Sequence, residues 1–200
     1  MARIYMYSVA CLLIYLVRPG SSLFSWHPTL MTIGAMFIFY EAIILFDLKK
    51  GLLEGTTRQT KINIHGLLQF IGTVILFTGF TSVAMHKFNL NKPHFASLHS
   101  ALGAAAGATV GWQCLGGIVT RFSWLSPVPV KYLKLGHTIF GTLSYFFICL
   151  TFIVGIFTDY MAERTTPFIQ IILITLPMIA FATGFTRFIN KVLQNFLKPK

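Results

Sequence analysis

The stretch LKLGHTIFGTLSYFFICLTFIVGIF, residues 133–157, decides the fold class of this chain. Its single charged side chain, Lys134, lies at the start of the stretch. The hydrocarbon core of a bilayer is about 30 Å thick and a helix rises about 1.5 Å per residue, so about 20 apolar residues span it. The stretch therefore predicts a membrane-spanning helix.

Five more apolar runs lie on either side of this one. Together the six runs extend from Ile4 to Val17, His27 to Leu48, Ile62 to Met85, Phe95 to Val119, Leu133 to Phe157 and Pro167 to Thr186. Turn-forming residues separate them, for example Arg18-Pro19-Gly20-Ser21-Ser22. We therefore predict an all-α membrane protein with six transmembrane helices, which form a single domain over residues 1–200.

The first run is short and follows Arg3, a pattern that also fits a cleaved signal peptide. Against that alternative, Leu16-Val17-Arg18-Pro19-Gly20 is a poor match to the small-residue site at which signal peptides are cut. We favour a retained first helix.

The composition excludes an ordinary soluble domain. Of the 200 residues, 55% are hydrophobic and 10% are charged, whereas soluble domains carry about 25% charged residues. The net charge of +11 raises the question of nucleic acid, but Lys and Arg lie in short segments between the runs, with no nucleic-acid motif. We therefore expect a lipid bilayer, and no nucleic acid, as a partner. The three cysteines, Cys11, Cys114 and Cys149, lie in apolar runs and are expected to be small buried hydrophobic side chains.

Basic residues indicate the orientation of the chain, because cytosolic loops carry an excess of Lys and Arg. With six passes, 12 of the 16 basic residues fall on one side: Arg3, Lys49, Lys50, Arg58, Lys61, Arg121, Lys131, Lys134, Arg187, Lys191, Lys198 and Lys200. The other side has Arg18, Lys87, Lys92 and Arg164. This asymmetry predicts that both termini are cytosolic.

Four histidines lie near the starts of consecutive apolar runs, the second to the fifth: His27, His65, His99 and His137. Because successive helices alternate in direction, His27 and His99 are expected near the non-cytosolic face and His65 and His137 near the cytosolic face. Each pair is separated by 72 residues, and Ser25 recurs as Ser97 at the same offset. This pattern resembles a weak parallel repeat about an axis along the membrane normal.

Paired imidazoles at membrane depth favour a metal cofactor. Polar groups inside a membrane are costly and commonly mark a functional site, and neutral imidazole is a frequent metal ligand. Two imidazoles on facing helices of a bundle would fill both axial positions of a haem iron, which favours electron transfer over oxygen chemistry. Zinc or non-haem iron would need further ligands at the same depth. Nearby glycines fit either a large planar cofactor or close helix packing: Gly66, Gly72, Gly103, Gly107, Gly111, Gly136 and Gly141.

At these residues the chain resembles the cytochrome b561 family, and in particular its short animal branch. The resemblance rests on Arg18-Pro19-Gly20-Ser21-Ser22-Leu23-Phe24-Ser25-Trp26-His27-Pro28, His65 with Leu68-Gln69, His86-Lys87, Leu98-His99-Ser100, and Gly136-His137 with Gly141. It implies a central four-helix bundle of helices 2 to 5 that holds two haem b groups, one between His27 and His99 and one between His65 and His137. It also implies an endomembrane location, such as the endoplasmic reticulum or a vesicle, and a homodimer.

The resemblance further implies a transmembrane reductase. Cytosolic ascorbate would supply electrons, and a ferric chelate or monodehydroascorbate on the other side would accept them. Ascorbate is an anion, so cations beside the cytosolic pair are its candidate ligands: Arg58, Lys61, Lys131 and Lys134. The candidate acceptor site is the basic group His86, Lys87, Lys92 and His94. Phospholipid anchoring and solvated loop residues are the respective alternatives.

Other functional readings remain open from the sequence. The histidines could line a proton or metal path in a transporter, or the chain could be a haem-bearing subunit that takes electrons from a quinol or a protein. No flavin or nicotinamide motif is present. Glu41 lies deep in the second run, where we expect it to be protonated or hydrogen-bonded, with a proton-coupled role as one alternative.

Overall fold

The computed structural model describes residues 2–47 and 55–197, and within them it contains helices and no strand. The long helices are α1 (Ala2–Val17), α4 (Arg58–Asn89), α5 (Leu98–Arg121), α6 (Val130–Ile156) and α8 (Pro167–Leu197). The second predicted run forms one continuous helix of four parts, α2 (Trp26–Met31), the π-helical η1 (Thr32–Phe39), α3 (Tyr40–Ile44) and the 3-10 turn η2 (Leu45–Asp47). We call it the 26–47 helix. Two short elements, η3 (Ser123–Leu125) and α7 (Asp159–Ala162), lie in the connections.

The six predicted helices are all present, and the fold is that of an all-α membrane protein. Five of them are long and apolar enough to cross a membrane, and α1 is a shorter apolar helix. The observed ends differ from the predicted ones by several residues, because polar turns at Arg58–Lys61 and His86–Asn89 continue α4 beyond its apolar run. Leu48, the predicted end of the second run, lies outside the described residues, as do Lys49, Lys50, Lys198 and Lys200.

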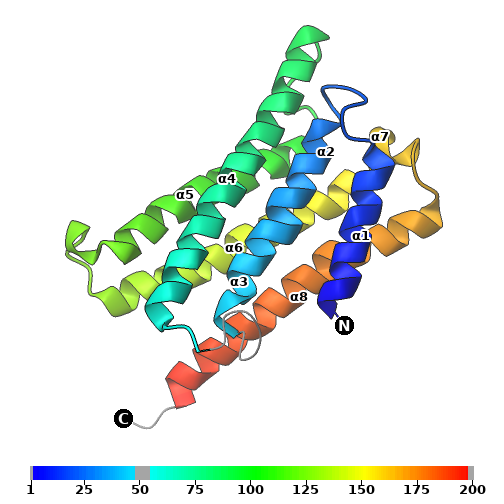
Figure 1. The fold of residues 1–200 in the computed structure, drawn as a ribbon. Helices are drawn as coiled ribbons and strands as arrows, with labels where there is room; N and C mark the ends of the chain where they lie inside the picture. The colour runs from blue at the N-terminus through cyan, green and yellow to red at the C-terminus, as the bar shows by residue number, and fades with distance from the viewer. Residues whose placement is uncertain (1, 48–54, 198–200) are drawn as a thin grey trace.

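The helices pack mainly as antiparallel pairs. The 26–47 helix lies along α4, and α5 lies along α6 (Figure 1). In contrast, α4 and α5 contact each other little although they are consecutive in the chain. On the outside, α8 packs against α6 and α1, and α1 also packs against η1. The central four helices are thus two helix pairs that face each other.

Glycines allow the 26–47 helix and α4 to approach closely. A Cβ atom on Gly34 would lie 3.0 Å from the Leu76 side chain, and one on Gly72 would lie 2.5 Å from the Phe39 ring. Gly34 and Phe39 both belong to the π-helical segment, and π-helical turns often occur at functional sites. Small residues at helix crossings are typical of membrane proteins, where close backbone contact replaces the hydrophobic effect as the source of stability.

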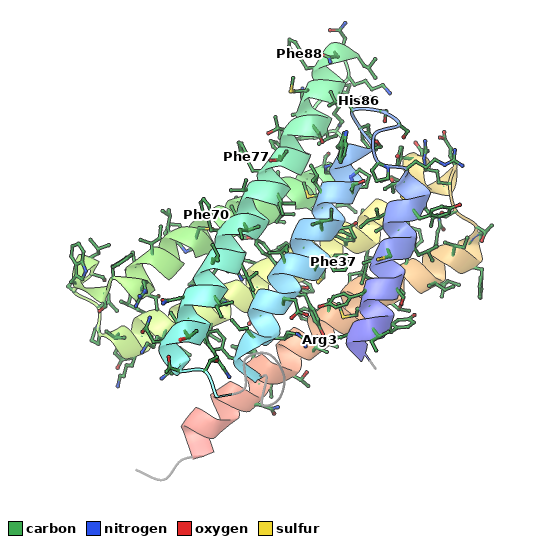
Figure 2. All side chains as sticks on the ribbon, in the orientation of Figure 1. Arg3, Phe37, Phe70, Phe77, His86 and Phe88 are labelled. Atoms are coloured by element: carbon green, nitrogen blue, oxygen red, sulfur yellow. The ribbon has the colours of Figure 1, made fainter. Side chains whose placement is uncertain are left out.

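The core lies between α1, the 26–47 helix, α6 and α8. Met6, Met36, Leu173 and Leu176 are fully buried there. The remaining surface of the long helices is strongly apolar: Phe70, Phe77 and Phe88 point outward from α4 (Figure 2), and each is at least 68% exposed. Such an outer surface fits contact with lipid.

The prediction for the cysteines is correct for one of the three. Cys149 is buried and Cys114 is half-buried, but Cys11 is exposed. The reason is the orientation of α1, which buries the stripe Met6, Ala10 and Leu13 and leaves the opposite face, with Cys11, uncovered.

Glu41 has a cationic partner on the first helix. Its carboxylate accepts hydrogen bonds from the Arg3 guanidinium and the Tyr7 hydroxyl. The expectation that this carboxylate is hydrogen-bonded is therefore confirmed. Arg3 thus pairs with an acidic group on a neighbouring helix instead of belonging only to the basic surface. The pair ties α1 to α3.

Breaking this pair on one side is expected to destabilise the protein. Arg3→Leu leaves the Glu41 carboxylate without its cation, and we expect the free energy of unfolding to fall by about 2 kcal/mol, less than for fully buried pairs because the Arg3 side chain is 40% exposed. Thermal unfolding in detergent measures the effect. The double variant Arg3→Leu with Glu41→Leu is expected to recover stability. If it were no more stable than the single variant, the charge pairing would have no energetic role.

Candidate functional site: two histidine pairs

A serine cap fixes the start of the helix that carries His99. Ser97 and Ser100 form a reciprocal capping box at the start of α5, on either side of His99. Such a box satisfies the first backbone donors of a helix and so defines where it begins. Before His27, the Ser25 backbone N–H donates to Ser22 Oγ at 3.1 Å, in the turn that leads into α2.

The first histidine pair lies between the two helix pairs, with one histidine from each. The ring centres of His27, from α2, and His99, from α5, lie 6.0 Å apart with an interplanar angle of 84°. His27 Nδ1 lies 3.1 Å from the Gly79 carbonyl oxygen, and His99 Nδ1 lies 3.1 Å from that of Thr151. In each case a backbone carbonyl from a neighbouring helix holds the ring.

The second pair has a similar ring geometry and lies toward the other end of the four central helices. The ring centres of His65, from α4, and His137, from α6, lie 6.3 Å apart at an interplanar angle of 81°. His65 Nδ1 lies 2.9 Å from the Ala42 carbonyl oxygen. Along α4, His65 and Gly79 are 14 residues apart, which at about 1.5 Å per residue separates the two pairs by about 21 Å.

These separations fit two imidazoles that bind one metal from opposite sides. A metal–imidazole nitrogen bond is about 2.0 Å and the ring centre lies roughly 1.1 Å behind the nitrogen, so two axial rings have centres about 6 Å apart. A hydrogen bond from Nδ1–H to a carbonyl leaves the Nε2 lone pair as the ligand atom, the usual support for a metal-binding histidine. Within residues 2–47 and 55–197, no group of three or more His, Cys, Asp or Glu side chains comes together. The geometry fits a metal that needs only two protein ligands, as a haem iron does.

The 72-residue repeat extends to the groups that support the first pair. Gly79 and Thr151, whose carbonyls hold His27 and His99, are themselves 72 residues apart. The repeat was weak in sequence because a backbone carbonyl can be supplied by any residue type. The structure thus contains two similar histidine–carbonyl units, related by the same offset as the ligands.

The glycines near the histidines divide into two groups. Some are packing positions: a Cβ on Gly155 would lie 2.9 Å from the His99 ring, and one on Gly117 would lie 3.3 Å from the His137 ring. Others have no described atom near the place of a Cβ, namely Gly66, Gly107, Gly111 and Gly136. Close packing therefore accounts for the first group of glycines, and a role of the second group in cofactor binding stays a prediction.

The predicted donor-site cations lie on the helices that carry His65 and His137. Arg58 and Lys61 are in the first turns of α4, and Lys131 and Lys134 are in the first turns of α6. Arg58, Lys131 and Lys134 are exposed and Lys61 is half-buried. The Lys131 ammonium lies 4.8 Å from the centre of the Tyr132 ring.

Sequence reasoning overlooked a polar cluster at this end. Arg121, in the last turn of α5, donates to Asn63 Oδ1 at 3.2 Å, and its guanidinium lies 3.0 Å from the side-chain amide of Gln59. Both partners are in the first two turns of α4, so the cluster ties the two helix pairs together near His65. Gln113, which contacts His137, was also overlooked. Glu41, 72 residues earlier, was the available signal, because it marks the same position of the repeat.

The predicted acceptor-site residues do not all lie together. His86 is in the last turn of α4 and packs on Phe24, whose ring also contacts His27, at centre distances of 5.4 and 5.9 Å. His94 instead lines a cavity of about 400 Å³ with Ala84, Met85, Phe88 and Asn89. Lys87 donates to the Pro93 carbonyl at 3.1 Å, which folds the loop back on α4, and Lys92 is exposed. Within this group, His86 is linked to His27 through the ring of Phe24.

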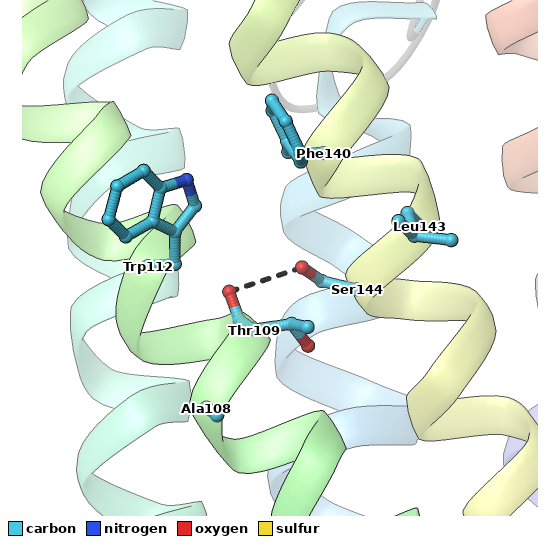
Figure 3. Close-up of a pocket in the computed structure, with 6 residues that line it drawn as sticks. All are labelled: Ala108, Thr109, Trp112, Phe140, Leu143 and Ser144. Carbon is cyan, nitrogen blue, oxygen red and sulfur yellow. Dashed lines mark hydrogen bonds between the residues drawn. The ribbon is translucent and has the colours of Figure 1, made fainter.

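A second cavity contains none of the predicted site residues. It has a volume of about 270 Å³ and lies between α5 and α6, where Ser144 Oγ donates to the Thr109 carbonyl at 3.2 Å (Figure 3). Its other lining residues are Ala108, Trp112, Phe140 and Leu143. Its lining is mostly apolar, which fits a groove on a surface that faces lipid.

Comparison with known proteins shows the family to which the chain belongs. The family described as eukaryotic cytochrome b561 matches residues 26–162, which include both histidine pairs and the four central helices. The chain belongs to the cytochrome b561 family. As a cytochrome b561 it binds haem b and is an oxidoreductase of the membrane, as predicted.

Several relatives of this cytochrome b561 come from animals. It is 34% identical over 152 residues to the mouse transmembrane reductase CYB561D2, covering 76% of this chain and 68% of the relative. The cattle protein of the same name is 32% identical over 165 residues, with 82% and 74% covered. A putative transmembrane ascorbate-dependent reductase, the CYB561 homolog of Caenorhabditis elegans, is 26% identical over 138 residues, with 66% and 52% covered.

Proposed function

We propose that this cytochrome b561 carries electrons across a membrane, from ascorbate at the His65/His137 end to an acceptor at the His27/His99 end, with one haem b held by each histidine pair. The observation that carries the proposal is the occurrence of two imidazole pairs with ring centres 6.0 and 6.3 Å apart, one near each end of the central helices. Bound haem would supply one-electron iron chemistry, and the two histidines of a pair would hold its iron.

The residues at the donor end fit an anionic reductant. Ascorbate gives up one electron and one proton and becomes the monodehydroascorbate radical. Arg58, Lys61, Lys131 and Lys134 place positive charge in the first turns of the helices that carry His65 and His137. A basic surface attracts an anion and raises its local concentration. The worm relative, named as ascorbate-dependent, supports this choice of donor.

At the other end, the acceptor would take up one electron. A ferric chelate would become ferrous, whereas monodehydroascorbate would take up one electron and one proton to give ascorbate. His86 approaches His27 through the ring of Phe24, and Lys87, Lys92 and His94 add basic character to the connection between α4 and α5. We propose that these four residues bind the acceptor.

The excess of basic residues at the donor end supports an orientation with this end and both termini in the cytosol. Similarity to the family supports an endomembrane location and a homodimer. Protease protection of epitopes on closed microsomes tests the orientation. We expect protease added outside to cleave the tags at both termini. Protection of both tags would mean that the orientation is the reverse.

Spectra and liposomes test the main proposal. Purified protein is expected to show b-type bands in a reduced-minus-oxidised spectrum, with two haems per chain. Liposomes loaded with ascorbate are expected to reduce a ferric chelate outside, when the donor end faces inward. Full haem content without chelate reduction by ascorbate, but with reduction by a quinol, would instead support a subunit of a larger redox complex.

A single donor-side charge is expected to affect the affinity for ascorbate. For Lys134→Gln we expect KM for ascorbate to rise about fivefold, which corresponds to about 1 kcal/mol for a charge pair near a protein surface, with normal haem content. Added salt should narrow the difference, because it screens exposed charges. Steady-state kinetics at two salt concentrations measure both effects.

Lys92→Gln is the matched control, since it removes the same charge at the other end of the molecule. With the acceptor at saturating concentration, it should leave KM for ascorbate unchanged. Equal effects of the two substitutions would show that net charge, and not a donor site near His137, controls the reaction.

A further inference from the structure

A side chain, Gln113, contacts the ring of His137. The Gln113 amide nitrogen, from α5, lies 2.9 Å from His137 Nδ1 and 3.3 Å from Nε2, and it donates to the backbone carbonyl of His137 at 2.7 Å. The similar distances to both ring nitrogens mean that the amide lies against the ring, while the carbonyl contact anchors it. For His27, His65 and His99, the contacts described above are with backbone carbonyls.

The surroundings of Gln113 keep its amide in this place. A Cβ on Gly141 would lie 2.7 Å from the Gln113 nitrogen, so glycine at position 141 leaves the space that the amide occupies. Gly117 lies on another side of the same ring, where a Cβ would be 3.3 Å from His137 Cε1. The imidazole of His137 therefore lies between Gly117 and the Gln113 amide, and Gly141 leaves the space for that amide.

The residue at the corresponding position of the repeat has different partners. The residue 72 positions before Gln113 is Glu41, and its side chain turns to Arg3 and Tyr7 of α1. The His65 ring is instead held by the carbonyl of Ala42, the next residue. A polar side chain at this position of the repeat thus reaches a histidine ring in the second half and helix α1 in the first.

We propose that Gln113 is a positioning residue that sets the orientation and the electron density of the His137 imidazole, and thereby the reduction potential of the haem b at the His65/His137 pair. The inference rests on the proposed function, because it requires this pair to hold a haem. A side-chain partner can be changed directly by an amino-acid substitution, whereas a backbone carbonyl cannot. The ring of His137 can therefore be tuned through the residue at position 113. Axial ligands and their hydrogen-bond partners are among the means by which a protein tunes haem iron.

Two substitutions of similar length test the proposal. Gln113→Glu brings a carboxylate against the ring, which should stabilise the ferric state, so one of the two haem components is expected to titrate at a lower potential and the other to stay unchanged. Gln113→Met removes the polar contact and keeps the volume. It is expected to alter one of the two low-spin ferric EPR signals, since these signals depend on the relative orientation of the two axial rings.

The matched control is Gln170→Glu, on α8. The Gln170 amide contacts the Ile156 carbonyl, at the opposite end of α6 from His137. In this variant, the reduction potential and the EPR signal of the His65/His137 haem should stay unchanged. Haem content is measured for every variant by pyridine haemochrome.

Three results would count against the proposal. Unchanged potentials and EPR signals in both Gln113 variants would overturn it. Partial loss of one haem would also overturn it if the molecules that keep both haems had unchanged potentials and EPR signals, because that result indicates a packing role. A shift of both haem components together would point to a general charge effect and would also overturn it. Absence of haem from the unsubstituted protein would instead contradict the proposed function itself.

Discussion

Replacement of His99 by alanine is expected to remove one haem b and to abolish electron transfer across the membrane. His99 and His27 have ring centres 6.0 Å apart, so loss of one ring leaves a metal bound there with a single protein ligand. His65→Ala is expected to have the same effect at the other pair. Haem content, reduced-minus-oxidised spectra and chelate reduction by ascorbate-loaded liposomes measure the result.

The matched control is His94→Ala, which removes a histidine near the start of α5 that lies outside both pairs. It should retain both haems, whatever its effect on the acceptor. Unchanged haem content in both His99→Ala and His65→Ala would refute the assignment of the pairs. Loss of both haems from each variant would show instead that the two sites assemble as one unit.

Gly155→Ala is expected to have the second largest effect, although it adds only one methyl group. The new Cβ would lie 2.9 Å from His99 Cε1 and 3.1 Å from Nδ1, so the ring must move. The ring has little freedom, because Nδ1 contacts the Thr151 carbonyl one turn earlier on the same helix. We expect haem affinity at the His27/His99 pair to fall by about 10- to 100-fold, as is typical when the support of a metal ligand is changed.

Gly184→Ala on α8 is the control for the loss of a helical glycine. Its Cβ would lie 3.8 Å from the nearest neighbour, an ordinary van der Waals distance. Haem titration of both variants, followed by absorbance, gives the comparison. Equal affinities in Gly155→Ala and Gly184→Ala would show that the His99 ring can move without cost, and that its observed position is not required for cofactor binding.

The helices and the histidine pairs could be predicted from sequence because both depend on simple physical patterns. Apolar runs of sufficient length must span a bilayer, and alternation of helix direction then fixes which histidines share a depth. The structure indeed brings His27 to His99 and His65 to His137. Hydropathy carries no information on backbone hydrogen bonding, however, so the π-helical segment Thr32–Phe39 could not be predicted from its apolar residues.

The parts of the site that sequence reasoning overlooked depend on single contacts. Gln113 is one polar residue within an apolar run, and only the packing of α5 on α6 brings it to His137. Arg121 was assigned to the basic surface, because its contacts with Asn63 and Gln59 join helices whose relative placement the sequence does not state. His86 and His94 are eight residues apart in sequence, yet one packs on Phe24 and the other lines a cavity.

The sparse packing between α4 and α5 links the folding of this protein to its cofactor supply. The two helix pairs face each other across the histidines, so a ligand that binds both pairs at once would cross-link them. Binding of this kind stabilises the folded state by mass action, by about 4 kcal/mol when the free ligand is at 1,000 times its Kd. Quality control in a haem-starved cell is therefore expected to degrade the newly made chain faster, and haem availability would set the amount of reductase in the membrane.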